Sequence, residues 1–259
     1  MRAALYDKRY HLSLLLALLV LCLWLPRPWL SADILQPPSL AHPFGTDMLG
    51  RDVLLNVLKS LPNTLLIALA AGVLPVAFAL LLNALAYALG NLCRSLLLKL
   101  TDIMLILPST LLLIVLAAFI QPSLWGSIVL VSALAWPGDF RIIGSALQKA
   151  LQKDSLLLAR SYGAGKAYLL RRHIVPAISP MLYALILQNG RRAISATAGL
   201  AFLGLLDPRI ANLGSLLLDS QNQLHSAAFW WLLLPPMLAL ALVLMFMTSL
   251  QSRQVRHVL

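Results

Sequence analysis

The chain has 259 residues, of which 60% are hydrophobic and 11% are charged, and its formal net charge is +11. This composition excludes a soluble globular domain and is typical of a polytopic membrane protein. The basic residues fall between apolar stretches, so the positive-inside rule explains the charge better than nucleic-acid binding does. All nine acidic residues are Asp, which leaves little material for catalysis by paired carboxylates.

The apolar stretches predict one all-α domain, residues 1–259, with six transmembrane helices. The first stretch follows a basic N-terminus and lacks a small-residue cleavage site after it, so we interpret it as an uncleaved span. Both termini are then cytoplasmic. Fourteen Lys and Arg residues fall in cytoplasmic segments and four in external ones, as this orientation requires. The predicted spans are residues 11–30, 61–89, 100–120, 127–143, 178–206 and 229–250.

An external segment, residues 42–58, separates the first two spans and is predicted to be an amphipathic helix at the membrane surface. Thr46 or Asp47 is the expected N-cap, and Arg51 is expected to pair with Asp47 at a spacing of four residues. A scaffold helix without substrate contact is the interpretation that we favour for the individual residues. The polar motif in this segment consists of Gly45, Thr46, Asp47, Gly50, Arg51 and Asp52.

A short loop, Asn91–Lys99, is expected before the third span. Asp102 lies near the cytoplasmic end of that span, where it either reaches the interface or pairs with Lys99.

Residues 144–177 form a cytoplasmic loop that is rich in Lys and Arg. Apolar residues recur at helical spacing on both sides of Gly163-Ala164-Gly165. Two glycines within three residues end one helix and allow a tight turn before the next. A helix, a turn and a second helix of this kind suit docking to a soluble partner. An ordinary basic loop is the alternative.

The fifth span contains Arg191 and Arg192 in the middle of apolar sequence, directly after Gln188-Asn189-Gly190. A guanidinium at membrane depth costs about 2.5–3.5 kcal/mol on insertion scales. The span offers no carboxylate to neutralise the two charges. We therefore expect these side chains to face water, a partner helix or a substrate.

Three motifs resemble those of the dipeptide, oligopeptide and nickel permeases of ABC importers. Ala159–Ala164, followed by Arg171–Pro176, resembles the EAA loop, which forms the coupling helix that docks on the ATP-hydrolysing subunit. Gly45–Asp52 resembles the GTDxxGRD segment, and Ala198–Gly204 resembles the AGLSFLGLG ending of the fifth span. Leu157 stands where the loop often has Glu, a departure that the nickel permeases share. The resemblance assigns ATPase coupling to Asp154, Ala159, Arg160, Gly163, Ala164 and Gly165.

This resemblance implies a transmembrane subunit of a type I ABC importer in the bacterial inner membrane. The expected partners are a second permease subunit, two ATP-binding subunits, an external substrate-binding protein and membrane lipid. ATP and Mg would bind the partner ATPase subunits, so the chain would carry no cofactor and catalyse no reaction. The five His residues are scattered and show no metal-ligand spacing, so no metal site is expected.

The two arginines, together with Asn189, are candidates for lining the substrate path, and they favour an anionic cargo because guanidinium groups match carboxylates. We expect nickel or a metal chelate (metallophore) first and short peptides second. Pairing of Arg191 and Arg192 with an acid of the partner subunit is the alternative. A stand-alone secondary transporter or channel is the alternative of another class.

Overall fold

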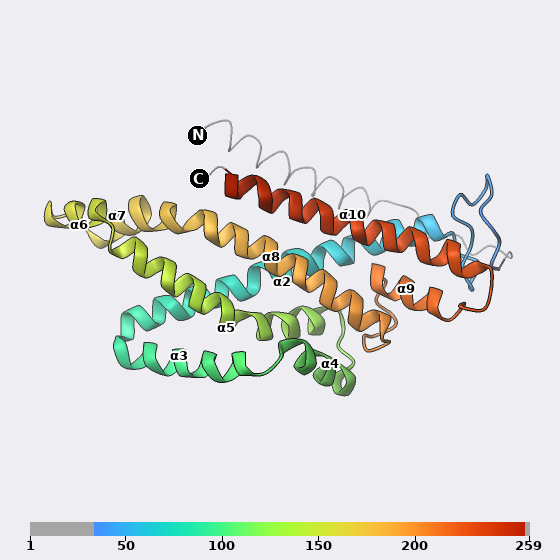
Figure 1. Cartoon of the computed structure of the whole chain (residues 1–259), viewed down its shortest axis with the longest axis horizontal. Helices are drawn as coiled ribbons and strands as arrows, with labels where there is room; N and C mark the ends of the chain where they lie inside the picture. Colours follow the sequence, from blue (N-terminus) through green and yellow to red (C-terminus); the bar gives the residue numbers. More distant parts are fainter. Residues whose placement is uncertain (1–33, 257–259) are drawn as a thin grey trace. The chain divides into compact units, whose positions relative to one another are not determined.

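The computed structural model describes residues 34–256, and the predicted first span, residues 11–30, lies outside them. Within this range the chain is helical, apart from connecting loops and one isolated β-bridge between Thr46 and Asp52 (Figure 1). The prediction of an all-α chain is confirmed for these residues. The helices are α2 (Val53–Leu89), α3 (Asn91–Ile106), α4 (Ser109–Ile120), α5 (Leu124–Leu151), α6 (Asp154–Ser161), α7 (Lys166–Leu169), the π-helical turn η1 (Leu170–Ile174), α8 (Val175–Phe202), α9 (Leu213–Gln221) and α10 (Ala228–Arg256).

Three described helices, α2, α5 and α10, are long and apolar enough to cross a membrane. Helices α3 and α4 are long and apolar enough to form a fourth span only when taken together. This span would be broken, because the two helices meet at an angle of 78°. Helix α8 does not belong to this set, since its polar run Gln188–Arg192 interrupts the apolar sequence. The described residues thus provide three or four candidate spans.

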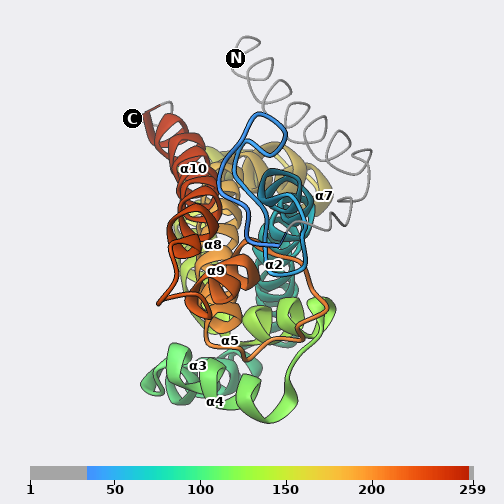
Figure 2. The same cartoon turned by 90° about the vertical axis from the view of Figure 1, so that its right-hand side faces the viewer.

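The chain divides into two compact units. The first unit comprises the described part of Met1–Ile67, then Gln121–Leu124 and Thr197–Leu244. Its core joins the start of α2, helix α9 and the start of α10 (Figure 2) through Val53, Val57, Leu213, Ala228 and Leu232. Gly214 of α9 lies against Ala198 of α8, where an added Cβ would come within 2.5 Å of the Ala198 Cα.

The second unit comprises Ala68–Ile120, Trp125–Ala196 and the C-terminal segment from Met245. Its main core joins α2, α5 and α8 through Val76, Ala79, Trp136, Phe140, Ile143 and Leu185. Helices α2 and α8 approach closely at two glycines: a Cβ on Gly72 would lie 2.7 Å from the carbonyl oxygen of Ile186, and one on Gly190 would lie 2.7 Å from that of Ala68. Small residues allow this backbone contact, as in other membrane helix pairs.

Three local predictions are wrong. The external segment is not a helix from Thr46 onward, because residues 42–52 form a folded loop and α2 begins only at Val53. The segment Asn91–Lys99 is not a loop but the start of α3. Of the two alternatives for Asp102, pairing with Lys99 is the wrong one, because its carboxylate forms an ion pair with Arg141 of α5. The sequence did not reveal this pair because its members are far apart in the chain.

The break between α3 and α4 has a local cause. Pro108 lacks an N–H and disfavours a helical conformation in the residue before it. Leu107 is accordingly extended, with φ −80° and ψ 130°. The third predicted span therefore consists of two helices.

Candidate functional site

The expected coupling loop folds as α6, a glycine turn and α7, in the second unit. Asp154 lies in the first turn of α6, where the positive end of the helix dipole favours a carboxylate. Helix α6 ends at Ser161, and Gly163, two residues further on, has a φ of 81°. The N–H of Ala164 donates to the carbonyl of Ala159 at 3.1 Å across this glycine, which is the hydrogen bond of a Schellman C-cap. The prediction of a helix–turn–helix is confirmed.

One face of this loop packs on the ends of α5 and α8. Leu156 of α6, Leu169 of α7 and Ile174 of η1 are buried against Ala150 and Ile178. Ala159 and Ala164, two of the residues assigned to coupling, are partly buried in the same cluster. The loop is therefore fixed to the helices on both sides of it.

The opposite face of the loop exposes large side chains that the sequence interpretation did not single out. Leu158 is 59% exposed and Tyr162 is 89% exposed. Asp154, Gly163 and Gly165 are exposed beside them. Spacing alone does not tell which apolar stripe of a short helix faces the core, and Leu158 belongs to the exposed stripe. This tip of the loop combines large exposed apolar side chains with polar ones, and such a surface suits contact with another protein.

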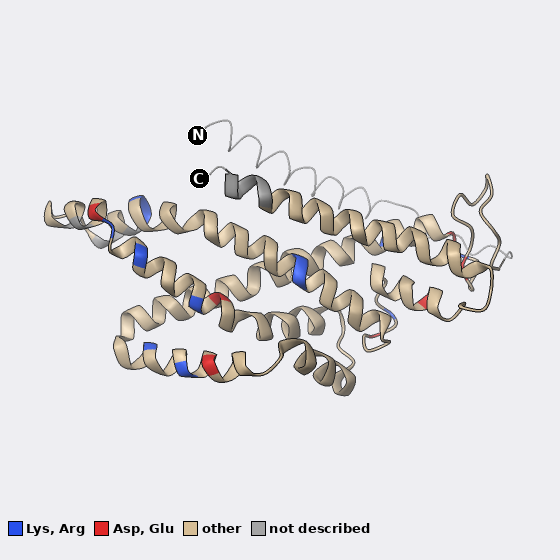
Figure 3. Ribbon diagram, viewed as in Figure 1, with Lys and Arg blue, Asp and Glu red and all other residues tan. Residues whose placement is uncertain are grey.

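The polar run Gln188–Arg192 of α8 belongs to the second unit as well. Figure 3 shows basic residues in the middle of α8. Asn189 Nδ2 donates to Asp139 Oδ2 of α5 at 2.6 Å, and both residues are at least 97% buried, with exposures of 2% and 3%. Arg192, one turn further along α8, interacts electrostatically with the same carboxylate. Asn189 is one of the residues predicted to line a substrate path, and in the structure its amide bonds to a buried acid.

Arg191 points differently from Arg192, as adjacent helical residues must. Its Nη1 donates to Thr248 Oγ1 of α10 at 3.2 Å. Arg191 is half-buried, and Arg192 is exposed. The sequence interpretation did not foresee Asp139 as a charge partner, because this residue belongs to a different helix 53 positions earlier in the chain.

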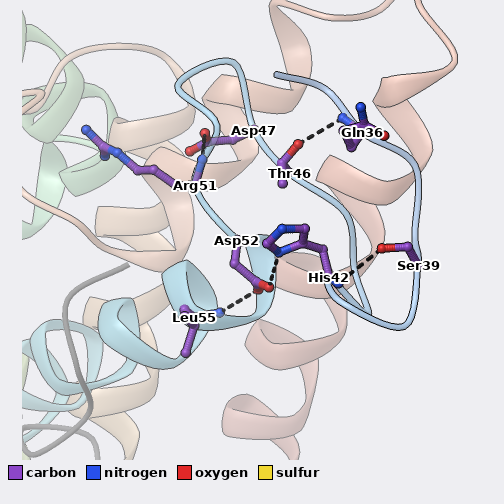
Figure 4. Close-up of polar contacts among 8 residues, drawn as sticks. All are labelled: Gln36, Ser39, His42, Thr46, Asp47, Arg51, Asp52 and Leu55. Atoms are coloured by element: carbon purple, nitrogen blue, oxygen red, sulfur yellow. Dashed lines mark hydrogen bonds and ion pairs between the residues drawn. The ribbon is translucent and has the colours of Figure 1, made fainter. Parts of the chain in front are cut away.

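The external motif lies in the first unit and its polar groups are used within the loop (Figure 4). Asp47 Oδ1 accepts hydrogen bonds from the backbone N–H groups of Leu49 and Arg51, both at 2.8 Å, and its Oδ2 accepts from Asn56 Nδ2 at 2.9 Å. Thr46 is fully buried, and its Oγ1 accepts from the Gln36 N–H at 2.8 Å. The Asp47–Arg51 contact thus runs through the Arg51 backbone.

Asp52 is the N-cap of α2, in place of the predicted Thr46 or Asp47. Its Oδ1 accepts from the Leu55 N–H at 3.2 Å, and its Oδ2 is 2.9 Å from His42 Nδ1. Gly45 and Gly50 have φ values of 72° and 69°, which other residues rarely adopt. This network is the structural reason for the motif and supports a scaffold role.

A small pocket beside this loop is lined by Asp47, Asn56 and Asp219, together with apolar residues of α2, α9 and α10. Burial raises the pKa of Asp219 above its usual value, the neighbouring Asp47 raises it further, and Arg51 opposes this shift. Among residues 34–256, no group of three His, Cys or Asp side chains is arranged to hold a metal ion.

Comparison with known proteins identifies relatives of most of the chain. Residues 76–258 match the family of binding-protein-dependent transport system inner membrane components. A protein of Brucella suis biovar 1, provisionally named a peptide permease protein, is 32% identical over 94% of this chain and 82% of its own length. The di/tripeptide transport system permease protein DppC of Pseudomonas aeruginosa is 29% identical over 89% of this chain and 80% of its own length.

The fold also has a solved counterpart. A chain of the inward-facing MetNI methionine ABC transporter superposes with a TM-score of 0.59 and 17% identity, and the match covers 79% of this chain and 96% of that one. This likeness shows that the helices follow the fold of that transporter chain.

Proposed function

Because the chain belongs to the family of binding-protein-dependent transport system inner membrane components and is the permease subunit of an ABC importer, we propose that it forms half of a path for short peptides across the bacterial inner membrane. The family supplies membrane components and not enzymes, in agreement with the sequence prediction. The exposed tip of the coupling loop is the observation that supports docking of an ATP-binding subunit.

The proposed assembly contains this chain, a second permease subunit, two ATP-binding subunits and an external binding protein. ATP and Mg belong to the ATP-binding subunits. Closure of these subunits would push the α6–α7 loop, and the packing of this loop on α5 and α8 would carry the movement into the membrane. Both termini would be cytoplasmic, as the distribution of Lys and Arg predicts.

Peptides now take precedence over nickel and metal chelates as the proposed cargo. The names of the two curated relatives described above support this choice, and a peptide carboxylate matches the guanidinium group of Arg192. A metal chelate with carboxylate groups shares that chemistry and is the second candidate. Family membership argues against a stand-alone transporter.

The test is purification of the tagged chain from its native membrane in mild detergent, followed by identification of the bound proteins. We expect a second permease and an ATP-binding protein. The reconstituted complex should then import radiolabelled alanine dipeptide and tripeptide when ATP and the binding protein are supplied. If the complex takes up radioactive nickel, alone or chelated by free histidine, and does not take up the peptides, the proposal of a peptide cargo is wrong. A chain that purifies alone would contradict the importer assembly.

A further inference from the structure

Helices α5 and α8 flank the coupling loop in sequence, and the halves of both helices that lie next to the loop are in contact in the second unit. Next to the loop, Ala150 and Ile178 pack together with Leu156 and Leu169. Further into the helices, Phe140 and Ile143 of α5 share a core with Leu185 of α8. The Asp139–Asn189 hydrogen bond lies beside this second core: Asp139 directly precedes Phe140 on α5, and Asn189 is one turn from Leu185 along α8.

Apolar contact between helices is not directional, so two apolar faces can shift against one another without losing a specific bond. A hydrogen bond to a carboxylate is directional and strong. The carboxylate of Asp139 is buried, and a shift of one helical turn would leave it without the Asn189 amide. Buried polar pairs of this kind are best known for fixing the register of helices.

The surroundings of Asn189 restrict α8 from a second side. The next residue, Gly190, lies directly against the backbone of Ala68 in α2. Asn83 of α2 in turn donates from Nδ2 to the carbonyl of Phe140 at 3.0 Å, next to Asp139. Directly before Arg191 and Arg192, Asn189 is thus held by α5 and Gly190 is held by α2, while the Asn83 bond ties α5 to α2.

We propose that Asp139 is a positioning residue for transport: by accepting the hydrogen bond of Asn189, it fixes the register of α5 against α8, so that movement of the coupling loop reaches Arg191 and Arg192 as one rigid displacement. This inference rests on the proposed function. It also assigns Asn189 to the scaffold of the path and not to cargo binding.

The first test measures peptide uptake per ATP hydrolysed by the complete complex in proteoliposomes, with alanine tripeptide as the probe. We expect Asp139→Ala and Asn189→Ala to lower this ratio by about tenfold, the effect of losing a charged hydrogen bond, while ATP hydrolysis continues. The exchange variant Asp139→Asn with Asn189→Asp restores the pair with its donor and acceptor reversed, so it should recover most of the ratio.

Ser132→Ala is the matched control, because Ser132 is also a buried polar residue of α5, but its Oγ donates to Ile128 of the same helix. This variant should behave like the wild type. The proposal is overturned if both Ala variants keep the wild-type ratio, or if the exchange variant is no better than the single ones.

The second test needs no cargo. Spin labels are attached to Cys at the exposed positions Ser145 of α5 and Ser179 of α8, with Cys22 and Cys93 replaced by Ser. Electron paramagnetic resonance should give the same distance between the labels in the nucleotide-free and the ATP-bound complex. In Asp139→Ala the distribution should broaden or shift with ATP. A distance change in the otherwise wild-type complex would overturn the proposal. If the wild-type complex imports no peptide, the proposed cargo is wrong. The role of Asp139 is still tested, because the distance between the labels does not depend on the cargo.

Discussion

The N–H of Ala164 donates to the carbonyl of Ala159 at 3.1 Å, and Gly163 between them has a φ of 81°. This bond closes α6 and turns the chain toward α7. An L-residue with a side chain at such a φ costs about 1–2 kcal/mol. The space around Gly163 is open, so the backbone conformation and not crowding requires glycine.

We therefore expect Gly163→Ala to lower peptide uptake per ATP several-fold by distorting the coupling turn. The matched control is Gly165→Ala, since Gly165 is two residues away, is also in open space and does not have a positive φ. Uptake and ATP hydrolysis by both variants are compared in proteoliposomes. Equal behaviour of the two variants would show that the turn geometry does not matter for coupling.

Residue types and spacing were sufficient to predict this turn, because a glycine-rich sequence acts locally. The helical nature of the chain was also predictable, because the spacing of apolar residues is a local pattern too. Contacts between distant segments were not: Asp102 pairs with Arg141, and Asn189 pairs with Asp139. Their partners follow from how helices pack, which no local pattern encodes.

For the external motif, the sequence predicted the role of the residues but not their secondary structure. Its residues were recognisable, and a scaffold role was favoured, but a helix was assigned to them. The loop prevails because the side chains of Asp47 and Asp52 bind nearby backbone N–H groups. Short acidic side chains compete with helical hydrogen bonding in this way.

Asp47 is expected to be important for the stability of the external loop. Asp47→Ala removes three hydrogen-bond acceptor contacts, which should destabilise this unit by about 2–3 kcal/mol. Asp207→Ala is the control, because the Asp207 side chain accepts from the Arg209 N–H in a short exposed turn. Limited proteolysis of the external side in sealed vesicles should cleave the first variant faster. Equal cleavage rates would contradict the scaffold role.

Arg192 is expected to recognise the cargo carboxylate. It is exposed, whereas the neighbouring Arg191 donates to Thr248. The wild-type complex should take up alanine tripeptide better than the same peptide with a C-terminal amide, and Arg192→Ala should lose this preference by about tenfold or more. Thr248→Val is the control for disturbance of the neighbouring arginine. An unchanged preference in assembled Arg192→Ala complex would exclude carboxylate recognition by this residue.

Asp219 predicts a pH dependence of stability. Its pKa in the folded protein is raised by burial and by Asp47, so the fold favours the protonated form. The penalty for ionisation appears as the pH rises above the ordinary pKa and is complete above the folded one. Asp219→Asn should therefore raise the melting temperature at about pH 7 and have a smaller effect at about pH 4. Solvent screening keeps the difference below about 1 kcal/mol. A variant that is less stable at neutral pH would contradict this assignment.

Gly190 provides the sharpest steric test in the second unit, because an added Cβ would lie 2.7 Å from the backbone oxygen of Ala68. Backbone cannot yield as a flexible side chain can, so we expect Gly190→Ala to separate α2 from α8 at a cost of about 1–3 kcal/mol. Gly199→Ala is the matched control: it lies in the same helix, has no atom within 4 Å of the added Cβ, and should gain up to about 1 kcal/mol in helix propensity. Melting of the purified complex measures both. Equal melting temperatures of Gly190→Ala and Gly199→Ala would show that α2 and α8 do not approach closely in the membrane. In that case α2 would not hold the segment that carries Arg191 and Arg192.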